Sequence, residues 1–359
     1  MYIYHRGWFI VYGREFVMRR WEGFEHGINF GGWLSQCDHT KDRYDNFIKE
    51  EDFKRVSEWG LDHVRIPIDY NLVENEAGDY IEAGFAYIDS AIKWSRTYGL
   101  NVILDLHKTY GFSFDDGEHE EGFFENRSYQ ERFYRLWENF ASRYGHLGDS
   151  VAFEILNEVT DKSYCDKWNS ISTECIRRIR AIAPKVKILI GGYYNNSIEA
   201  LPDLLPPYDD KIIYNFHCYE PLIFTHQGAY WAAGMDTSFR ISIDAPYSEL
   251  KEATRKNLSQ VSVGFEDFDE TKSLGVEYFD KYFSEAVRIA EERNVPLYCG
   301  EYGVINLAEP KDTLQWYKYI NEVFEKYGIG RAAWSYKEMD FGFIDDHMKE
   351  VLPEVIKLL

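Results

Sequence analysis

The stretch VAFEILNEVT, residues 151–160, decides the fold of this chain. It begins as a short apolar run of the kind found in strands buried in a parallel sheet, and it ends abruptly in Asn157 and Glu158. A second apolar run, residues 295–300, leads in the same way into Glu301. A single glutamate at a strand end is more often a loop carboxylate or a helix cap. Two of them are what the hydrolysis of a glycosidic bond requires, one as proton donor and one as nucleophile or base.

Apolar strand-like runs alternate with segments of helical periodicity along the rest of the chain. Strands alternating with helices indicate a parallel sheet, and eight such units indicate a (β/α)8 barrel. Because such barrels reach a length of 359 residues as one domain, we expect a single domain over residues 1–359. The predicted strands are 25–33, 63–67, 101–107, 151–156, 186–190, 212–217, 295–300 and 329–335, and the predicted helices are 52–59, 87–98, 130–144, 168–182, 276–292, 314–326 and 349–358.

Two segments fall outside this alternation. Residues 8–11 and 16–19 flank a turn and predict a β-hairpin within residues 1–20, which we expect to plug one end of the barrel. Residues 219–273 follow the sixth strand, where a loop of about two to six residues would suffice. Insertions after barrel strands lie on the catalytic face, so this insert is expected to wall a cleft. The alternative is a tolerated surface excursion.

The composition fits a carbohydrate-binding protein. Aromatic residues make up 17% of the chain, and aromatic rings pack against the C–H faces of sugars as well as filling cores. The net charge of −21 repels nucleic-acid phosphates and anionic lipid surfaces, so neither nucleic acid nor a membrane is an expected partner. Five cysteines without paired spacing indicate reduced core residues. We expect a monomer that needs no metal or cofactor.

The N-terminal segment lacks the apolar core of a signal peptide, and no run approaches the roughly 18 apolar residues of a membrane span. The sequence alone therefore predicts a cytoplasmic protein, with secretion as the alternative if an export signal was removed.

The ends of the predicted strands carry side chains that converge on one face of a barrel. Each has an ordinary explanation when taken alone: a buried ion pair for an arginine, a satisfied core histidine, or an aromatic that fills the core. Their recurrence at strand ends favours a shared site. The candidates are Arg65, His107, Asn157, Glu158, His217, Tyr219, Glu301 and Trp334.

Glycoside hydrolysis gives these side chains candidate roles. Arg65 can keep a neighbouring carboxylate ionised, as a nucleophile requires, because an opposite charge lowers the pKa of a carboxyl group. Glu158 must stay protonated to donate to the leaving oxygen, so its surroundings should raise its pKa. Asn157 can hydrogen-bond a sugar 2-hydroxyl. The remaining candidates can orient the carboxylates (His107, His217 and Tyr219) or lie under the reacting sugar (Trp334).

These motifs resemble glycoside hydrolase family 5, of the clan with its acid and nucleophile on strands four and seven. The resemblance covers about residues 27–341 and rests on the motifs ILNE (155–158), NFHCY (215–219) and CGEYG (299–303). It implies that Glu158 is the acid/base, that Glu301 is the nucleophile and that stereochemistry is retained. Lys108 departs from the His-His pair of some bacterial relatives.

The linkage of the substrate stays open. The motif GINFGGWL (27–34) is similar to the opening of exo-acting β-1,3-glucanases and equally to bacterial endoglucanases that act on cellulose and mixed-linkage glucan, and FTHQGAYW (224–231) is similar to the latter. The exo enzymes carry a glutamate where Cys37 stands. We nevertheless favour a pocket closed on the non-reducing side and release of glucose from β-1,3-glucan, because the insert begins with side chains able to wall a sugar pocket. The substrate-binding candidates are Trp33, Trp334, His226, Gln227 and Trp231.

Three alternatives accompany this reading. The first is an endo-β-glucanase acting on β-1,4 or mixed-linkage glucan. The second is an inactive barrel that only binds glycans, which we would expect to lose one of the two glutamates. The third is a barrel enzyme acting on phosphorylated sugars, although no glycine-rich phosphate loop follows the seventh or eighth strand.

Overall fold

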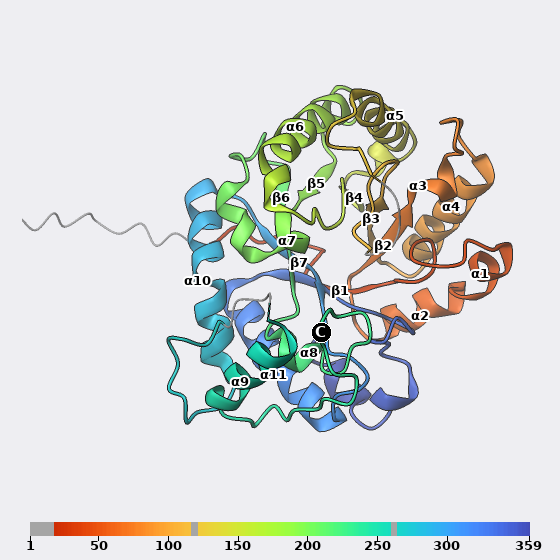
Figure 1. Ribbon diagram of the computed structural model, residues 1–359. Helices are drawn as coiled ribbons and strands as arrows, with labels where there is room; N and C mark the ends of the chain where they lie inside the picture. The colour runs from red at the N-terminus through yellow and green to blue at the C-terminus, as the bar shows by residue number, and fades with distance from the viewer. Residues whose placement is uncertain (1–17, 116–120, 260–263) are drawn as a thin grey trace, which may run out of the picture.

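The computed structural model describes residues 18–115, 121–259 and 264–359. Eight parallel strands form a closed barrel in sequence order, with the first strand paired to the eighth (Figure 1). This confirms the predicted (β/α)8 barrel. The strands are β1 (His26–Asn29), β2 (His63–Asp69), β3 (Asn101–Lys108), β4 (Val151–Glu154), β5 (Lys187–Ile190), β6 (Ile212–Cys218), β7 (Leu297–Tyr302) and β8 (Gly330–Ala333).

Long amphipathic helices surround the barrel (Figure 1). In α5 (Arg127–Tyr144), for example, Phe133, Trp137, Phe140 and Tyr144 recur every three or four residues and are buried. The other long helices are α2 (Glu50–Glu58), α4 (Glu82–Thr97), α6 (Cys165–Ile182), α10 (Val276–Arg293) and α11 (Pro310–Tyr327). The remaining helices are α1 (Lys41–Asn46), α3 (Tyr70–Val73), α7 (Tyr193–Asn196), α8 (Leu222–Thr225), α9 (Tyr247–Asn257) and α12 (Leu352–Val355).

The last predicted helix was too long. The structure has only α12 in place of the helix predicted over residues 349–358. Pro353 lies in the first turn of α12, and a proline without a backbone N–H is tolerated there but not further inside a helix, so the helix cannot begin a full turn earlier.

Among the described residues, no helix is both long and apolar enough to cross a membrane.

Residues 21–24 close the end of the barrel at which the strands begin. Trp21 stacks on Phe24 with ring centroids 4.1 Å apart and meets the edge of Tyr298 at 5.3 Å. The three rings share a core cluster with apolar side chains of β3 to β6 and β8 inside the barrel. Most of the hairpin predicted within residues 1–20 lies outside the described residues.

The connection after β6 is long, as predicted, and it folds on itself. It contains α8 and α9, and a bridge between Pro246 and Ser273 joins its middle to its C-terminal end. Inside it, Tyr247 stacks on Phe268 at 4.8 Å. Asp312 in α11 accepts hydrogen bonds from Ser242 Oγ and from the backbone N–H of Ile243. The insert is therefore fixed to the barrel.

Candidate active site

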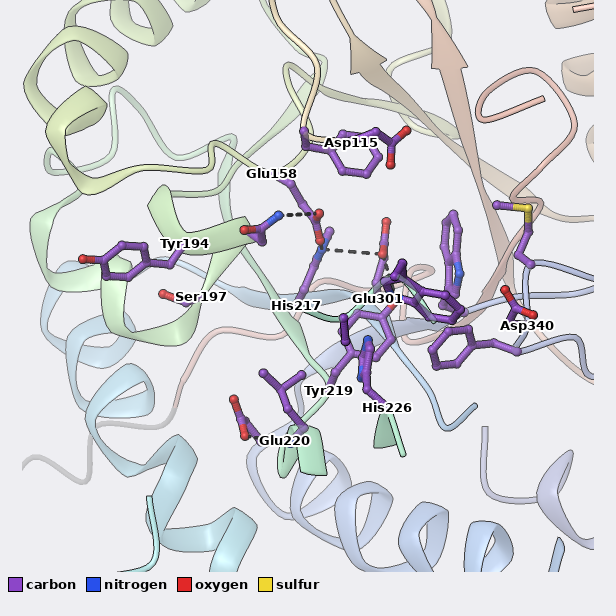
Figure 2. A pocket seen from close by; sticks show the side chains of 18 of the residues that line it. Asp115, Glu158, Tyr194, Ser197, His217, Tyr219, Glu220, His226, Glu301 and Asp340 are labelled. Atoms are coloured by element: carbon purple, nitrogen blue, oxygen red, sulfur yellow. Dashed lines mark hydrogen bonds and ion pairs between the residues drawn. The ribbon is translucent and has the colours of Figure 1, made fainter. Parts of the chain in front are cut away.

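Two carboxylates face one another where β4 and β7 end (Figure 2). Glu301 lies in β7, whereas Glu158 follows β4 with a φ of 41°, a left-handed backbone conformation that is uncommon for a residue other than glycine. One oxygen of each carboxylate and Nδ1 of His217 all lie within 4.8 Å of one another. In retaining glycosidases the two carboxyl groups are about 5–5.5 Å apart, and inverting enzymes need roughly 6.5–9.5 Å. The pair has the retaining spacing.

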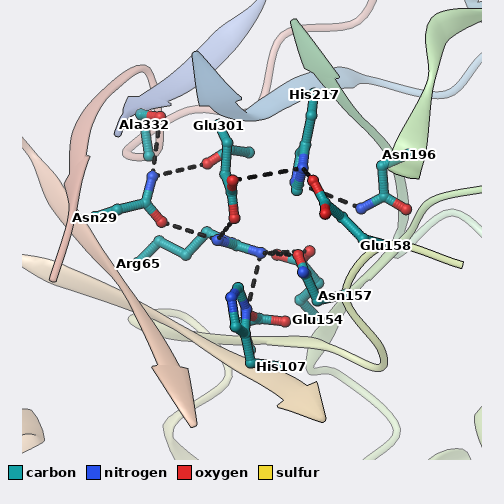
Figure 3. A network of polar contacts seen from close by, with 12 residues as sticks. Asn29, Arg65, His107, Glu154, Asn157, Glu158, Asn196, His217, Glu301 and Ala332 are labelled. Atoms are coloured by element: carbon teal, nitrogen blue, oxygen red, sulfur yellow. Dashed lines mark hydrogen bonds and ion pairs between the residues drawn. The ribbon is translucent and has the colours of Figure 1, made fainter. Parts of the chain in front are cut away.

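Arg65 connects Glu301 of this pair to two further buried carboxylates, those of Glu154 and Asp105 (Figure 3). Its Nη1 donates to Glu301 Oε1 at 2.7 Å, and its Nε and Nη2 donate to the two oxygens of Glu154 at 2.7 and 2.9 Å. Nη2 also lies 3.0 Å from Asp105 Oδ2. The Arg65 side chain is fully buried, and a buried charge is tolerated only with such partners.

Two asparagines complete the contacts of Arg65. Its Nη1 donates to Asn29 Oδ1 and its Nη2 to Asn157 Oδ1, each at 2.9 Å. The other side-chain atom of Asn157, Nδ2, has no hydrogen-bond partner among the described residues. A buried donor left without a partner is costly, so the Asn157 amide is an N–H available to a bound molecule.

Both oxygens of Glu301 accept hydrogen bonds. Oε1 accepts from Arg65, and Oε2 accepts from the hydroxyl of Tyr219 at 2.9 Å. An ionised carboxylate is an acceptor at both oxygens, so these contacts suit Glu301 in its charged form.

Glu158 has different neighbours. Asn195 Nδ2 donates to Glu158 Oε2 at 3.0 Å, and His217 Nδ1 lies 2.7 Å from Oε1. The Asn196 amide faces His217 Nε2 at 3.4 Å, which leaves the imidazole proton on Nδ1, pointing at Glu158. Burial lowers the pKa of His217 to about 4, so its ring is neutral near pH 7. Burial raises the pKa of Glu158 against the opposing hydrogen bond from Asn195.

The backbone that supplies these asparagines is unusual. Tyr194, Asn195 and Asn196 all have left-handed conformations, with φ of 52°, 57° and 55°. Asparagine enters this region more readily than most residues, which explains why it occurs here. Successive left-handed residues bring Asn195 and Asn196 to Glu158 and His217 respectively.

Trp334 lines the cleft from the end of β8. Its ring is nearly parallel to that of His107, at 7° and 5.9 Å between centroids, and His107 Nδ1 lies 2.6 Å from Asp105 Oδ2. A Cβ on Gly31 would approach the Trp334 ring to 2.6 Å, so only glycine fits there.

The insert supplies a second aromatic wall. His226 and Trp231 lie 5.5 and 6.3 Å from Phe341, and all three line the cleft. The whole cleft has a volume of about 720 Å³. On its opposite side lies Asp115, whose carboxylate is held by Lys108 Nζ at 2.7 Å. Lys108, which departs from the family motif, therefore has a partner at the cleft.

The prediction that Trp33 and Gln227 bind the substrate was wrong. The Trp33 side chain is fully buried, donates its indole N–H to the carbonyl oxygen of Tyr44 and packs in the core. Gln227 is also buried, and both polar ends of its side chain are used inside the insert: Nε2 donates to Phe224 O at 2.9 Å and Oε1 accepts from Ile241 N at 3.0 Å. Neither residue lines the cleft.

Several residues of the site, among them Glu154, Asp105 and Asn195, were not singled out from the sequence. Glu154 and Asp105 are acids that directly follow apolar runs in β4 and β3, and that exception was the available signal. Asn195 lies in a connection with no periodicity to place it.

The atoms of Glu158, His217 and Glu301 could also surround one metal ion. Their hydrogen bonds to one another, to Arg65, to Tyr219 and to Asn195 already occupy the same atoms.

The retaining spacing of two carboxylates at the mouth of a (β/α)8 barrel defines a glycoside hydrolase. The family model described as cellulase (glycosyl hydrolase family 5) matches residues 13–340, so the chain belongs to glycoside hydrolase family 5. Enzymes of this family act by the retaining double displacement.

Similar proteins cover nearly the whole chain. Cellodextrinase A of Ruminococcus flavefaciens is 50% identical over 316 residues, which are 88% of this chain and 86% of that protein. Endoglucanase C of Acetivibrio thermocellus is 36% identical over 94% of this chain and 98% of its own. Among solved structures, Thermotoga maritima Cel5A in complex with cellobiose superposes with a TM-score of 0.74 at 25% identity and covers 93% of this chain and 97% of that one. The chain is a β-glucan hydrolase.

Proposed function

We propose that this enzyme cleaves internal β-1,4 bonds of glucans and gluco-oligosaccharides, with Glu301 as nucleophile and Glu158 as acid/base. The observation that carries the roles is the difference between the two carboxylates. Glu301 accepts hydrogen bonds from a cationic guanidinium and a phenol, whereas Glu158 contacts a neutral imidazole and an amide, with its pKa raised by burial.

In the first step, a Glu301 oxygen attacks the anomeric carbon while Glu158 gives its proton to the departing glycosidic oxygen. The bond to the leaving chain breaks and an ester between the sugar and Glu301 forms. Arg65 and Tyr219 keep the Glu301 oxygens directed until the attack. In the second step, Glu158 removes a proton from water, the water oxygen bonds to the anomeric carbon, and the Glu301 carboxylate leaves.

The remaining side chains bind and orient the sugar. The free Nδ2 of Asn157 donates to the 2-hydroxyl of the reacting glucose, a contact that strengthens in the transition state. Trp334 lies under the same ring, and His107, fixed by Asp105, supports Trp334 from behind. His226 and Trp231 form an aromatic wall beside it.

For the specificity, we replace the hypothesis favoured from the sequence, an exo-acting β-1,3-glucanase, with its alternative, an endo-β-glucanase. The relatives that cover nearly the whole chain are named cellodextrinase and endoglucanase. The cleft also has lining residues on both sides of the carboxylate pair, with Asp115 on one and Ser197 and Glu220 on the other. A site that extends in both directions from the reacting bond suits an internal bond better than a chain end.

Product analysis tests this proposal. Cello-oligosaccharides, carboxymethyl-cellulose, lichenan and laminarin are each incubated with the enzyme, and the Glu301→Gln variant serves as the control for contaminating activity. We expect mixed short oligosaccharides from the β-1,4-linked substrates and a rapid fall in the viscosity of carboxymethyl-cellulose. Release of glucose alone from laminarin, with viscosity unchanged, would restore the exo-β-1,3 reading.

A further inference from the structure

The position of Glu158 fixes the direction in which the leaving part of the substrate extends. The acid must lie beside the glycosidic oxygen that it protonates, so the reducing-end half of the chain departs on the Glu158 side. Asn195, from the segment after β5, is the neighbour of Glu158 on that side. Figure 2 shows Tyr194 and Ser197 on the side of Glu158 that faces away from Glu301. The reducing-end half of the cleft therefore runs towards residues 194–197.

Polar and aromatic side chains line this half. Ser197, Glu220 and Tyr282 all contribute to the cleft wall. The hydroxyl of Ser197 has no hydrogen-bond partner within the part of the chain that the structure describes. Glu220 accepts a hydrogen bond from the backbone N–H of Leu222 at 3.1 Å, and burial raises its pKa to about 7. These groups can exchange hydrogen bonds with sugar hydroxyls, and none of them has a part in the chemical steps.

A second cavity of about 270 Å³ lies next to this half of the cleft. It lies between the 3-10 helix η3 (Ile198–Asp203), α10 and the insert. Tyr282 lines both the cleft and this cavity. The chain makes a second connection, since Ser197 lines the cleft and the next two residues, Ile198 and Glu199, line the cavity. The two spaces therefore adjoin at Tyr282 and at residues 197–199.

The lining of the second cavity has the chemistry of a sugar subsite. The rings of Tyr278 and Tyr282 are parallel, at 4° and 6.1 Å, and Phe268 from the insert lies 5.6 Å from Tyr278. Tyr278 is buried in the core, whereas Tyr282 and Phe268 are only partly buried and can offer aromatic surface to the C–H faces of glucose. The charged side chains at the cavity include exposed Glu199 and the ion pair of Lys281 with Asp267. Net negative charge disfavours an anionic ligand and suits a neutral one with many hydroxyls.

We propose that this second cavity binds the reducing-end glucosyl residues of a β-1,4-glucan chain whose reacting bond lies between Glu158 and Glu301. The inference rests on the proposed function for the identity of the sugar. Chains long enough to reach past Tyr282 gain contacts with Phe268 and Glu199 that short substrates cannot make. The subsite thus gives the enzyme a preference for longer chains.

The test compares long and short substrates in two variants, Phe268→Ala on the insert and Glu199→Ala on η3. We measure kcat/KM on cellohexaose and on an aryl β-cellobioside, whose small aglycone ends before the second cavity. A stacking contact is worth about three- to tenfold in binding, so Phe268→Ala should lower kcat/KM on cellohexaose by about that factor. Glu199→Ala should lower it less. Activity on the aryl cellobioside should stay within about twofold of wild type.

A matched control variant and a binding measurement separate the effect of the subsite from a general loss of activity. Tyr208 is an exposed aromatic that lines neither cavity, so Tyr208→Ala should change neither activity. In a Glu301→Gln background, titration with cellohexaose and cellotriose should show weaker binding of the longer sugar alone when Phe268 is replaced.

Equal losses on long and short substrates, or an unchanged ratio in both variants, would overturn the subsite. A wild-type enzyme that hydrolyses laminarin but no cello-oligosaccharide would instead overturn the proposed function. The two failures are therefore distinguishable.

Discussion

The two sides of the active site use the same residue type in opposite surroundings. Glu301 on β7 receives hydrogen bonds from Arg65 on β2 and from Tyr219, which directly follows β6. Glu158, which follows β4, faces neutral His217 on β6 and Asn195 after β5, and burial raises the pKa of Glu158. The barrel places a glutamate on each side, but the neighbours decide which one is the charged nucleophile. The fold thus sets the positions of the two glutamates, and the side chains that contact them set their catalytic roles.

Removing either carboxylate should have the largest effect. We expect Glu301→Gln and Glu158→Gln each to lower activity on an unactivated β-glucan by at least about a thousandfold, because neither covalent attack nor protonation has a substitute. Aryl glycosides with good leaving groups separate the two roles. Such a leaving group needs no proton, so the Glu158 variant should still show a burst of released phenol, whereas the Glu301 variant should not. Equal loss of that burst in both would contradict the assignment.

Removing the cation should affect stability as well as activity. Arg65→Met leaves Asp105, Glu154 and Glu301 buried without their cation, and breaking a buried ion pair from one side costs about 3–5 kcal/mol. We expect a loss of that order in the free energy of unfolding, measured in urea. Arg65→Lys keeps the charge without the planar fork and should lose less. A Met variant as stable as wild type would show that the three acids do not need Arg65.

The second donor to Glu301 can be removed on its own. Tyr219→Phe deletes the hydroxyl that donates to Oε2 at 2.9 Å and keeps the ring. Hydrogen bonds to charged groups are worth about 1.5–3 kcal/mol, so kcat should fall by about ten- to hundredfold while the folded structure stays intact. Circular dichroism and thermal unfolding serve as controls. An unchanged kcat would mean that Arg65 alone orients Glu301.

The smallest change should be visible in the pH profile. The carboxylate of Asp115 adds to burial in raising the pKa of Glu158. Asp115→Asn removes that negative charge, so the pKa of Glu158 should fall and the acid should lose its proton at lower pH. The alkaline limb of the kcat/KM profile should then move to lower pH. Asp166→Asn, an exposed substitution on α6, is the control and should leave the limb in place. A limb that moves to higher pH in Asp115→Asn would contradict this origin of the shift.

The positions at strand ends could be predicted from the sequence because the topology alone brings them together. Arg65, His107, Asn157, His217 and Tyr219 all surround the carboxylate pair once the barrel closes. The choice of partner could not be predicted, since it depends on which faces of neighbouring strands meet inside the barrel.

Glu154 and Asp105 show this limit most clearly. Glu154 is the last residue of β4, and Asp105 lies two residues before His107, on the same face of β3. Arg65 reaches both acids inside the barrel. Trp33 and Trp334 show another limit. Both follow glycine-rich or strand-end segments, yet one fills the core and the other lines the cleft, because packing and not local sequence decides which way an aromatic turns.

The cluster around Arg65 has more carboxyl groups than positive charges, so one of the carboxyl groups can keep its proton in the folded protein. One guanidinium meets three carboxylates, and one oxygen of Asp105 has no partner among the described residues. Burial raises the pKa of Asp105 to about 7, against the pull of Arg65. In the unfolded chain an aspartate has a pKa of about 3.9, so between these values the folded protein holds a proton that the unfolded chain releases. The protonation of Asp105 contributes fully to the free energy of unfolding at a pH below about 3.9, and this contribution is lost as the pH rises through about 7. The ion cluster beneath the catalytic pair therefore makes the barrel itself more durable in mildly acidic than in alkaline solution.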